Sequence, residues 1–220
     1  MYNHIIFYYH HNMSVSSSRI IQLYKSRSTI LELLEKQGFN IEDYQGFSIN
    51  EIDAMSANTQ LDMLLTHKTD ETKTYIKYYD SKQIRAQVLD EIIEDLYVID
   101  TVLTKKDTLI IIIDDEPNDP IKTKLEYLFD RRGVFVAIFN IKRLQFNILN
   151  HVLVPDAVVL TPEQQAEIMK SLQIRDLTQL PEISRFDPHA MALGLRPKQI
   201  AKFSRDSITA LTSDYYRVCV

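Results

Sequence analysis

Three consecutive carboxylates, Asp114, Asp115 and Glu116, follow an apolar run from Leu109 to Ile113. The run has the length and composition of a buried strand, so we expect the acids at the C-terminal end of a central strand, where active sites of open α/β sheets gather. Carboxylates there could bind Mg²⁺ for phosphodiester hydrolysis. Such a nuclease also needs a second metal ligand and a cation on the adjoining strand, but residues 134–140 carry no charge. We therefore expect the acids to be solvated, with a magnesium-dependent nuclease as the rival hypothesis.

Other catalytic patterns are missing from the sequence. The histidines are near the start of the chain or scattered, and none has a Cys or His partner at metal-ligand spacing; they are His4, His10, His11, His67, His151 and His189. The four glycines are not clustered, which excludes a phosphate-binding loop, and no serine has a Gly-x-Ser-x-Gly context. We expect no catalytic residue, no metal and no cofactor.

One segment has an electrostatic character that suits phosphate. Residues 117–120 lead into an expected helix, whose free N–H groups and partial positive charge favour an anion. The residues of interest are Asn118, Pro120, Lys122 and Lys124. Neighbouring acids oppose this interpretation. A second candidate surface lies on the first helix, where Arg19, Lys25 and Arg27 could form a weak basic face; the alternative is an ordinary solvated helix face.

The charge distribution argues against strong independent binding of nucleic acid. Residues 1–149 hold 17 Lys+Arg against 22 Asp+Glu, and residues 150–220 hold 8 against 8, which together give the net charge of -5. Phosphate neutralisation supplies most of the affinity of proteins that bind DNA alone. Any nucleic-acid contact should therefore be weak and depend on larger partners.

Periodicity and end signals predict an α/β first half. A helical pattern begins after Ser16–Ser18 and ends at Gly38, and Ser48 with Glu51 forms a capping box for a short helix ending near Ala57. Strands and helices then alternate, at 74–79, 83–96, 109–113, 121–132 and 134–139. A strand–helix–strand unit with continuously apolar strands predicts a parallel pair covered by its helix.

The pattern changes near residues 145–155. Thr161-Pro162-Glu163 predicts the start of a helix that ends at Leu172, and two strands are expected at 200–205 and 215–220. The last strand contains the only cysteine, Cys219, which we expect to be buried. The predicted domains are an extension (1–15), an α/β domain (16–149) and a small α+β domain (150–220).

The final third has a specific order of motifs. It contains His151-Val152-Leu153-Val154-Pro155, Leu180-Pro181-x-Ile183, Asp187-Pro188, Gly194 and Arg205, and then Ser207, Thr209, Tyr216 and Arg217. Asp187 can cap a short helix that Gly194 ends. In order and spacing this region resembles the C-terminal assembly domain of the fifth subunit shared by eukaryotic RNA polymerases I, II and III, and the archaeal polymerase subunit that is little more than this domain. The resemblance to the N-terminal half rests on element order and length.

The resemblance implies a non-catalytic polymerase subunit. An α/β jaw domain, restriction-endonuclease-like in fold but catalytically inert, would line the downstream DNA channel, with the segment from Asn118 to Lys124 near duplex DNA. The α+β assembly domain would dock on the largest subunit, beside a neighbouring small shared subunit. The implied docking residues are His151, Pro155, Leu180, Pro181, Asp187, Pro188, Gly194, Arg205, Ser207, Thr209, Tyr216 and Arg217. For Leu180 and Tyr216, core packing is an equal alternative.

The resemblance also sets expectations about partners and location. No apolar run approaches the ~20 residues that a membrane helix needs, so membrane association is not expected. A homo-oligomer is not expected either, and a free transcription adaptor is a further alternative. The family typically has Glu and Gly where this chain has Ile208 and Leu211, which puts the glycine-dependent turn conformation in doubt. Such divergence fits a remote eukaryotic lineage, with a nuclear protein, or a large DNA virus, with a protein of the virion and the infected cell; we favour the virus.

Overall fold

The first helix is longer than the sequence predicts. The computed structural model describes residues 2–220, with side chains from Ser18 onward, and α1 spans Tyr2–Lys36. The predicted start at Ser16–Ser18 is therefore wrong: no Gly or Pro interrupts residues 2–15, and the helix runs through the serines. The predicted end is correct, because Gly38 has a φ of 99° and its N–H donates to the Glu35 carbonyl at 2.9 Å. The side chains of His4, His10 and His11 lie outside the described residues.

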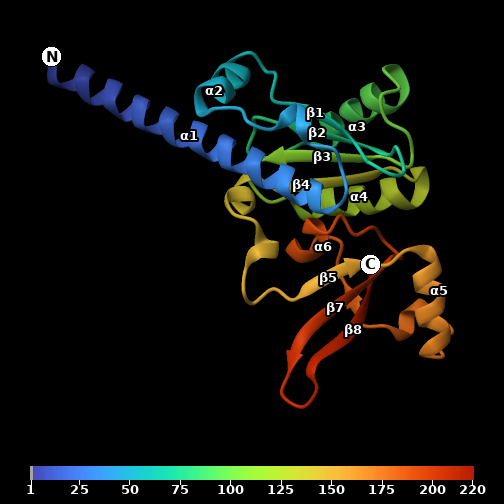
Figure 1. Ribbon diagram of the computed structural model, residues 1–220. Helices are drawn as coiled ribbons and strands as arrows, with labels where there is room; N and C mark the ends of the chain where they lie inside the picture. Colours follow the sequence, from blue (N-terminus) through green and yellow to red (C-terminus); the bar gives the residue numbers. More distant parts are fainter. Residues whose placement is uncertain (1) are drawn as a thin grey trace. The chain divides into compact units, whose positions relative to one another are not determined.

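A four-stranded mixed sheet forms the centre of the first unit (Figure 1). Its strands β1 (Met63–Thr66), β2 (Lys73–Tyr78), β3 (Thr108–Ile113) and β4 (Phe135–Asn140) lie in chain order. β1 is antiparallel to β2, whereas β2, β3 and β4 are parallel. The predicted strand–helix–strand unit is confirmed; β1 was not predicted.

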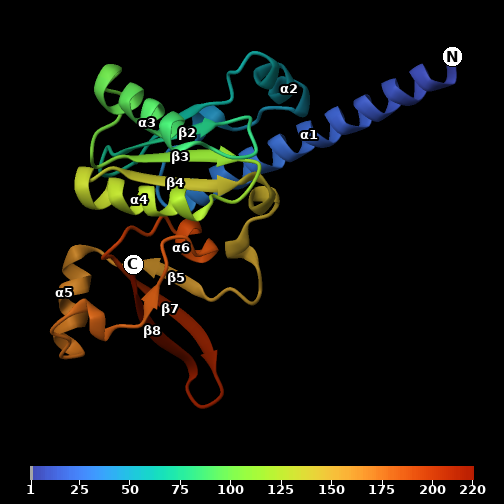
Figure 2. The ribbon, with the colours of Figure 1, turned by 180° about the vertical axis from the view of Figure 1, so that it is seen from behind.

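Helices cover both faces of this sheet. Figures 1 and 2 show α1 on one face and α3 (Ala86–Glu94) and α4 (Asp119–Arg132) on the other. An ion pair between Lys124 and Asp90 joins α4 to α3. α3 continues as a π-helical turn, η2 (Asp95–Ile99). Residues 109–113 of β3 are all buried, as expected for a strand covered on both sides.

Two predicted end signals of this unit are confirmed. The capping box of Ser48 and Glu51 opens α2 (Ile49–Ala57), which follows η1 (Glu42–Tyr44). Gly133 closes α4 in the left-handed region, at a φ of 69°. η3 (Ile141–Gln145) follows β4 and lies against α1. Among the described residues, no helix combines the length and apolar character needed to cross a membrane.

The chain divides into two compact units between Phe146 and Asn147. The second unit holds a sheet in the order β5-β7-β8-β6. Its strands are β5 (Asp156–Val159), β6 (Glu182–Ile183), β7 (Ile200–Ser207) and β8 (Leu211–Cys219). The predicted pairing of the chain end inside a sheet is confirmed, since β8 pairs with both β7 and β6. The division of the chain into extension, jaw and assembly domain stays a prediction.

The two faces of the second sheet bury different helices. α5 (Pro162–Ser171) contributes Ile168 and Met169 to a cluster around Leu160, Leu180, Ile200 and Val218. α6 (Pro188–Ala192) contributes Ala190 to a cluster with Ile183, Leu195, Ala201, Phe203 and Cys219. Because Ile200 and Ala201 are consecutive strand residues, the helices cover opposite faces. Cys219 is 1% exposed, which confirms its predicted burial.

Candidate docking and nucleic-acid surfaces

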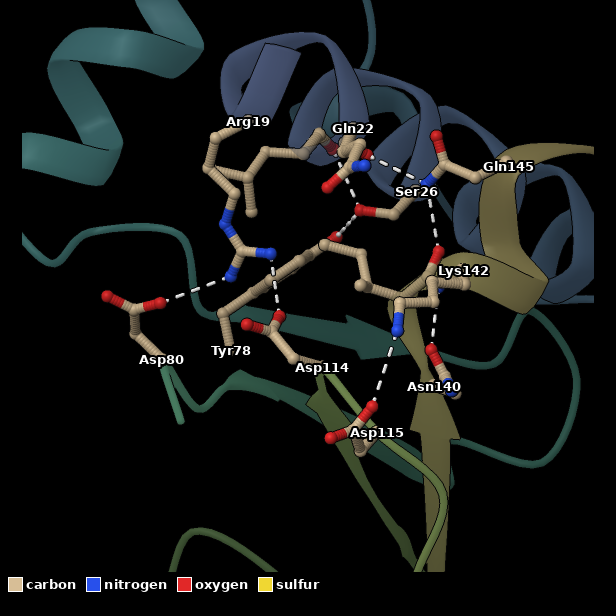
Figure 3. A network of polar contacts seen from close by, with 12 residues as sticks. Arg19, Gln22, Ser26, Tyr78, Asp80, Asp114, Asp115, Asn140, Lys142 and Gln145 are labelled. Atoms are coloured by element: carbon tan, nitrogen blue, oxygen red, sulfur yellow. Dashed lines mark hydrogen bonds and ion pairs between the residues drawn. The ribbon is translucent and has the colours of Figure 1, made fainter. Parts of the chain in front are cut away.

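The three acids that follow β3 each contact a basic side chain, and Figure 3 shows these contacts for Asp114 and Asp115. Arg19 of α1 spans two acids: its Nη1 lies 2.6 Å from Asp114 Oδ1, and its Nη2 lies 3.1 Å from Asp80 Oδ1. Lys142 Nζ lies 3.3 Å from Asp115 Oδ1. The cations come from α1 and η3, so the strand-end charge is largely neutralised within the unit.

Glu116 completes this network. Its Oε1 accepts from Arg143 Nε at 2.6 Å and from Asn140 Nδ2 at 3.2 Å. Across the part of the chain whose side chains are described, no three His, Cys, Asp or Glu residues could hold a metal ion together. The arrangement is that of a structural charge network, and nothing in it supports the nuclease hypothesis.

The segment that enters α4 begins as predicted. The Asn118 side chain accepts from Ile121 N–H, and Pro120 occupies the first turn. Lys122 lies 3.2 Å from Asp119, and Lys124 pairs with Asp90. Both lysines are thus engaged with carboxylates, which reduces the positive charge they present to a phosphate.

Two exposed cations beside this segment were missed from the sequence. Lys82 and Arg85 line an open pocket together with Asn118 and Pro120. They precede α3, and the topology places them at the same sheet edge as the start of α4. The parallel strands could have indicated this, because the loops after β2 and β3 meet at that edge.

The predicted basic face of α1 is wrong for Arg27. Arg27 is only 2% exposed, whereas Lys25 is exposed and Arg19 is half-buried. Arg27 Nη1 donates to the Leu61 carbonyl at 3.0 Å. The signal was available, since Arg27 lies on the buried stripe of Leu23, Ile30 and Leu34 at helical spacing. Arg27 is therefore a core residue and cannot contribute to a basic surface.

The segment from His151 to Pro155 is a surface turn in the second unit. His151 is exposed and its Nδ1 accepts from Leu153 N–H at 3.2 Å, while Pro155 is half-buried. Val152 is 97% exposed and Leu153 is 84% exposed. The turn holds two apolar side chains out toward solvent, as a protein-binding surface would.

Leu180 and Pro181 differ in exposure. Leu180 is buried in the cluster beneath α5, and Pro181 is exposed, with its carbonyl accepting from Val218 N–H at 3.0 Å. Leu180 has the packing role that the sequence left open. Pro181 fixes the approach of the chain to β6.

Asp187, Pro188 and Gly194 delimit α6. The Asp187 carboxylate accepts from His189 N–H at 2.8 Å, and Pro188 is the first helical residue. Gly194 has a φ of 66° and follows the C-cap Leu193. These three residues set the position of a helix that the core needs.

Arg205, Tyr216 and Arg217 lie on the β7–β8 hairpin. Arg205 Cζ lies 4.9 Å from the ring centroid of Tyr215, and Arg217 Cζ lies 5.7 Å from it. Tyr216 is on the opposite face, packed against the cluster beneath α5. Tyr215, absent from the predicted set, joins both arginines and stacks on Phe203 at 5.2 Å. An aromatic within the alternating pattern of the strand was the signal for it.

Ser207 and Thr209 build the hairpin turn. Ser207 Oγ accepts from Ala210 N–H at 3.4 Å and lies 3.4 Å from Thr209 Oγ1. Leu211 has a φ of 61°, in the left-handed region that favours glycine. The doubted turn conformation is therefore present with leucine in place of glycine, and both Ile208 and Leu211 are exposed.

The fold and these surfaces define the class of protein. It has an α/β unit, whose described residues form no metal-binding group, and a compact second unit with exposed apolar turns. Residues 146–219 match the family described as RNA polymerase Rpb5, C-terminal domain. The DNA-directed RNA polymerase subunit Rpo5 of Thermococcus kodakarensis is 42% identical over 76 residues, which cover 34% of this chain and 92% of that protein.

Two eukaryotic relatives extend the comparison. The RNA polymerases I, II and III subunit RPABC1 of Caenorhabditis elegans is 43% identical over 77 residues, covering 35% of this chain but 36% of that protein. The rpabc1 subunit of Dictyostelium discoideum is 26% identical over 205 residues, covering 92% of this chain and 98% of that protein. The chain belongs to the Rpb5 family of DNA-directed RNA polymerase subunits, as its C-terminal motifs predicted.

Proposed function

We propose that this chain is a non-catalytic subunit of a DNA-dependent RNA polymerase, held in the complex by its C-terminal domain. One observation carries the proposal: residues 146–219 match an assembly-domain family, and a relative named as a polymerase subunit consists almost entirely of this domain. The compact unit 147–220, with its own two-sided core, supports a module that docks as one piece.

The docking surface includes the exposed apolar turns. Val152 and Leu153 at one turn, and Ile208 and Leu211 at the hairpin tip, present apolar area that would be buried against other polymerase subunits. The largest subunit, with the small shared subunit beside it, is the partner we propose. Buried residues such as Leu180 act by shaping this surface.

The N-terminal unit acts as the jaw. We propose that the segment from Asn118 to Lys124, with Lys82 and Arg85, faces downstream duplex DNA. Because Lys122 and Lys124 already pair with carboxylates, they should attract DNA phosphates only weakly and guide the duplex without binding it tightly. We therefore expect the protein at the site of transcription, which is the nucleus if the protein is cellular, or the virion and the infected cell if it is viral.

A deletion tests the proposal. The full chain and a 1–149 fragment, each affinity-tagged, are expressed in cells that contain the cognate polymerase, and the purified complexes are analysed by quantitative mass spectrometry. We expect the full chain to be stoichiometric with the largest subunit and the 1–149 fragment to be absent. Incorporation of the fragment would overturn docking through the C-terminal domain, and substoichiometric full chain would favour a free adaptor.

A further inference from the structure

A pocket of about 510 Å³ lies in the first unit between α1 and the segment that leads into α2. The helix lines it with Tyr24, Ser28, Leu31 and Glu35, and the segment lines it with Tyr44 and Phe47. It is separate from the acids after β3 and from the start of α4. Neither the charge network nor the proposed docking surface uses it.

Arg27 lines this pocket, and two of its hydrogen-bond donors are not used by the described residues. Its Nε and Nη2 atoms are buried and have no partner among the described residues, and Nη1 alone donates, to the Leu61 carbonyl. No carboxylate among those residues forms an ion pair with it; instead the Phe47 and Tyr44 rings lie 5.4 and 5.7 Å from Cζ. A buried guanidinium with free N–H groups is strongly disfavoured unless an acceptor reaches it.

The rim of the pocket is acidic. Glu32 and Glu35 line it, and Glu42 and Asp43 are exposed in the same segment as Tyr44. A free anion would be attracted by Arg27 and repelled by these carboxylates. A ligand with neutral acceptor oxygens and a positive charge a few ångströms away satisfies both regions.

We propose that this pocket binds an extended basic segment of a partner polypeptide. Main-chain carbonyl oxygens accept hydrogen bonds from Arg27 Nε and Nη2, and a lysine or arginine side chain pairs with Glu35. The aliphatic stem of that side chain packs on the Tyr24 ring. The inference is independent of the assignment to polymerase.

Binding of such a ligand requires the segment over Arg27 to move, because Arg27 Nε and Nη2 are buried. The carbonyl reaches the shielded Nε and Nη2 when the Phe47 ring turns aside. Gly46, which precedes Phe47, has a φ of 81° and nothing within 4 Å of where a Cβ would stand. No described atom therefore packs against this side of the Gly46 backbone.

Titration of the ¹⁵N-labelled full chain with acetyl-Ala-Lys-Ala-Arg-Ala-amide tests the proposal by NMR. We expect the Arg27 Nε–H signal and the amides of Phe47 and Ser48 to shift with a common affinity. The matched peptide with glutamates in place of both basic residues should bind at least about tenfold more weakly. Tighter binding of the acidic peptide or of inorganic phosphate would overturn the proposal, as would no shift at about 10 mM basic peptide.

Variants separate the rim from a general effect of charge. Glu32→Lys with Glu35→Lys should weaken binding of the basic peptide about tenfold. The same change of charge in the other unit, Glu163→Lys with Glu167→Lys, should leave binding unchanged, because both residues are exposed there. Glu32 and Glu35 are also exposed, so the rim variant should fold. Equal affinity in the rim variant and in the Glu163→Lys, Glu167→Lys control would refute the proposed rim contact.

Discussion

Single residues in this chain adopt environments that their types usually avoid. Arg27 is buried and pairs with no carboxylate among the described residues, and Leu211 adopts a left-handed backbone conformation at the hairpin tip. Each has a local reason: two aromatic rings flank the Arg27 guanidinium, and a turn built by Ser207 fixes the backbone of Leu211. Such residues are where a substitution has an effect that is easy to interpret.

Leu211→Gly should stabilise the second unit by about 0.5–1 kcal/mol, because glycine adopts positive φ without steric strain. Leu211 is 86% exposed, so little buried area is lost. Urea unfolding followed by circular dichroism measures the change. Ala210→Gly is the control: Ala210 has no positive φ, so glycine there should destabilise slightly. A loss of stability in Leu211→Gly would contradict the strain argument.

His189 should make the second unit sensitive to acid. Burial lowers the pKa of His189 below 6.5, although Asp187 opposes the shift, and its Nε2 is buried without a partner among the described residues. Because the native pKa is lowered, the stability from the neutral ring is complete above pH 6.5 and is lost as pH falls through the native pKa.

The variant His189→Leu isolates this effect from the titration of carboxylates. Between about pH 7.5 and about pH 5.5, the free energy of unfolding should fall more for the wild-type chain than for the variant. Urea unfolding at both pH values provides the comparison. Equal falls in the two proteins would show that the His189 ring is not responsible.

At the scale of elements, signals local in sequence were predictable and pairings distant in sequence were not. The capping boxes at Ser48 and Thr161 and the stops at Gly38 and Gly133 all act where the sequence placed them. β1 and β6 were missed because they have four residues or fewer and are stabilised by partner strands. The contact of Arg19 with Asp114 joins residues 95 positions apart, which no local pattern encodes.

That contact should couple α1 to the end of β3. In a double-mutant cycle of Arg19→Gln and Asp114→Asn, we expect a coupling of about 0.5–1 kcal/mol, since both side chains are about a third exposed and partly screened. The matched cycle of Lys142→Met and Asp115→Asn should give less, because that pair is more exposed. Urea unfolding measures both cycles, and equal couplings would mean that burial does not set their strength.

At the scale of the whole molecule, the acidic charge and the docking surface that we propose belong to different units. Residues 1–149 carry the whole net charge of -5, and the net charge of residues 150–220 is zero. The sequence indicated this division through a change of periodicity near residues 145–155, and the compact units separate at Phe146. The motifs in the sequence did not distinguish surface residues from residues that shape the fold, such as Leu180 in a core cluster and Gly194 at the end of α6.

The fragment 147–220 should fold alone. It contains its complete four-stranded sheet and both helix-covered core clusters, and the archaeal relative is almost entirely this domain. We expect cooperative urea unfolding with dispersed amide NMR signals. The matched fragment 161–220 lacks β5 and the buried Leu160, so it exposes the edge of β7 and should be less stable by about 2–4 kcal/mol. A molten 147–220 fragment would mean that the core clusters need the first unit, and that the module cannot dock as an independent piece.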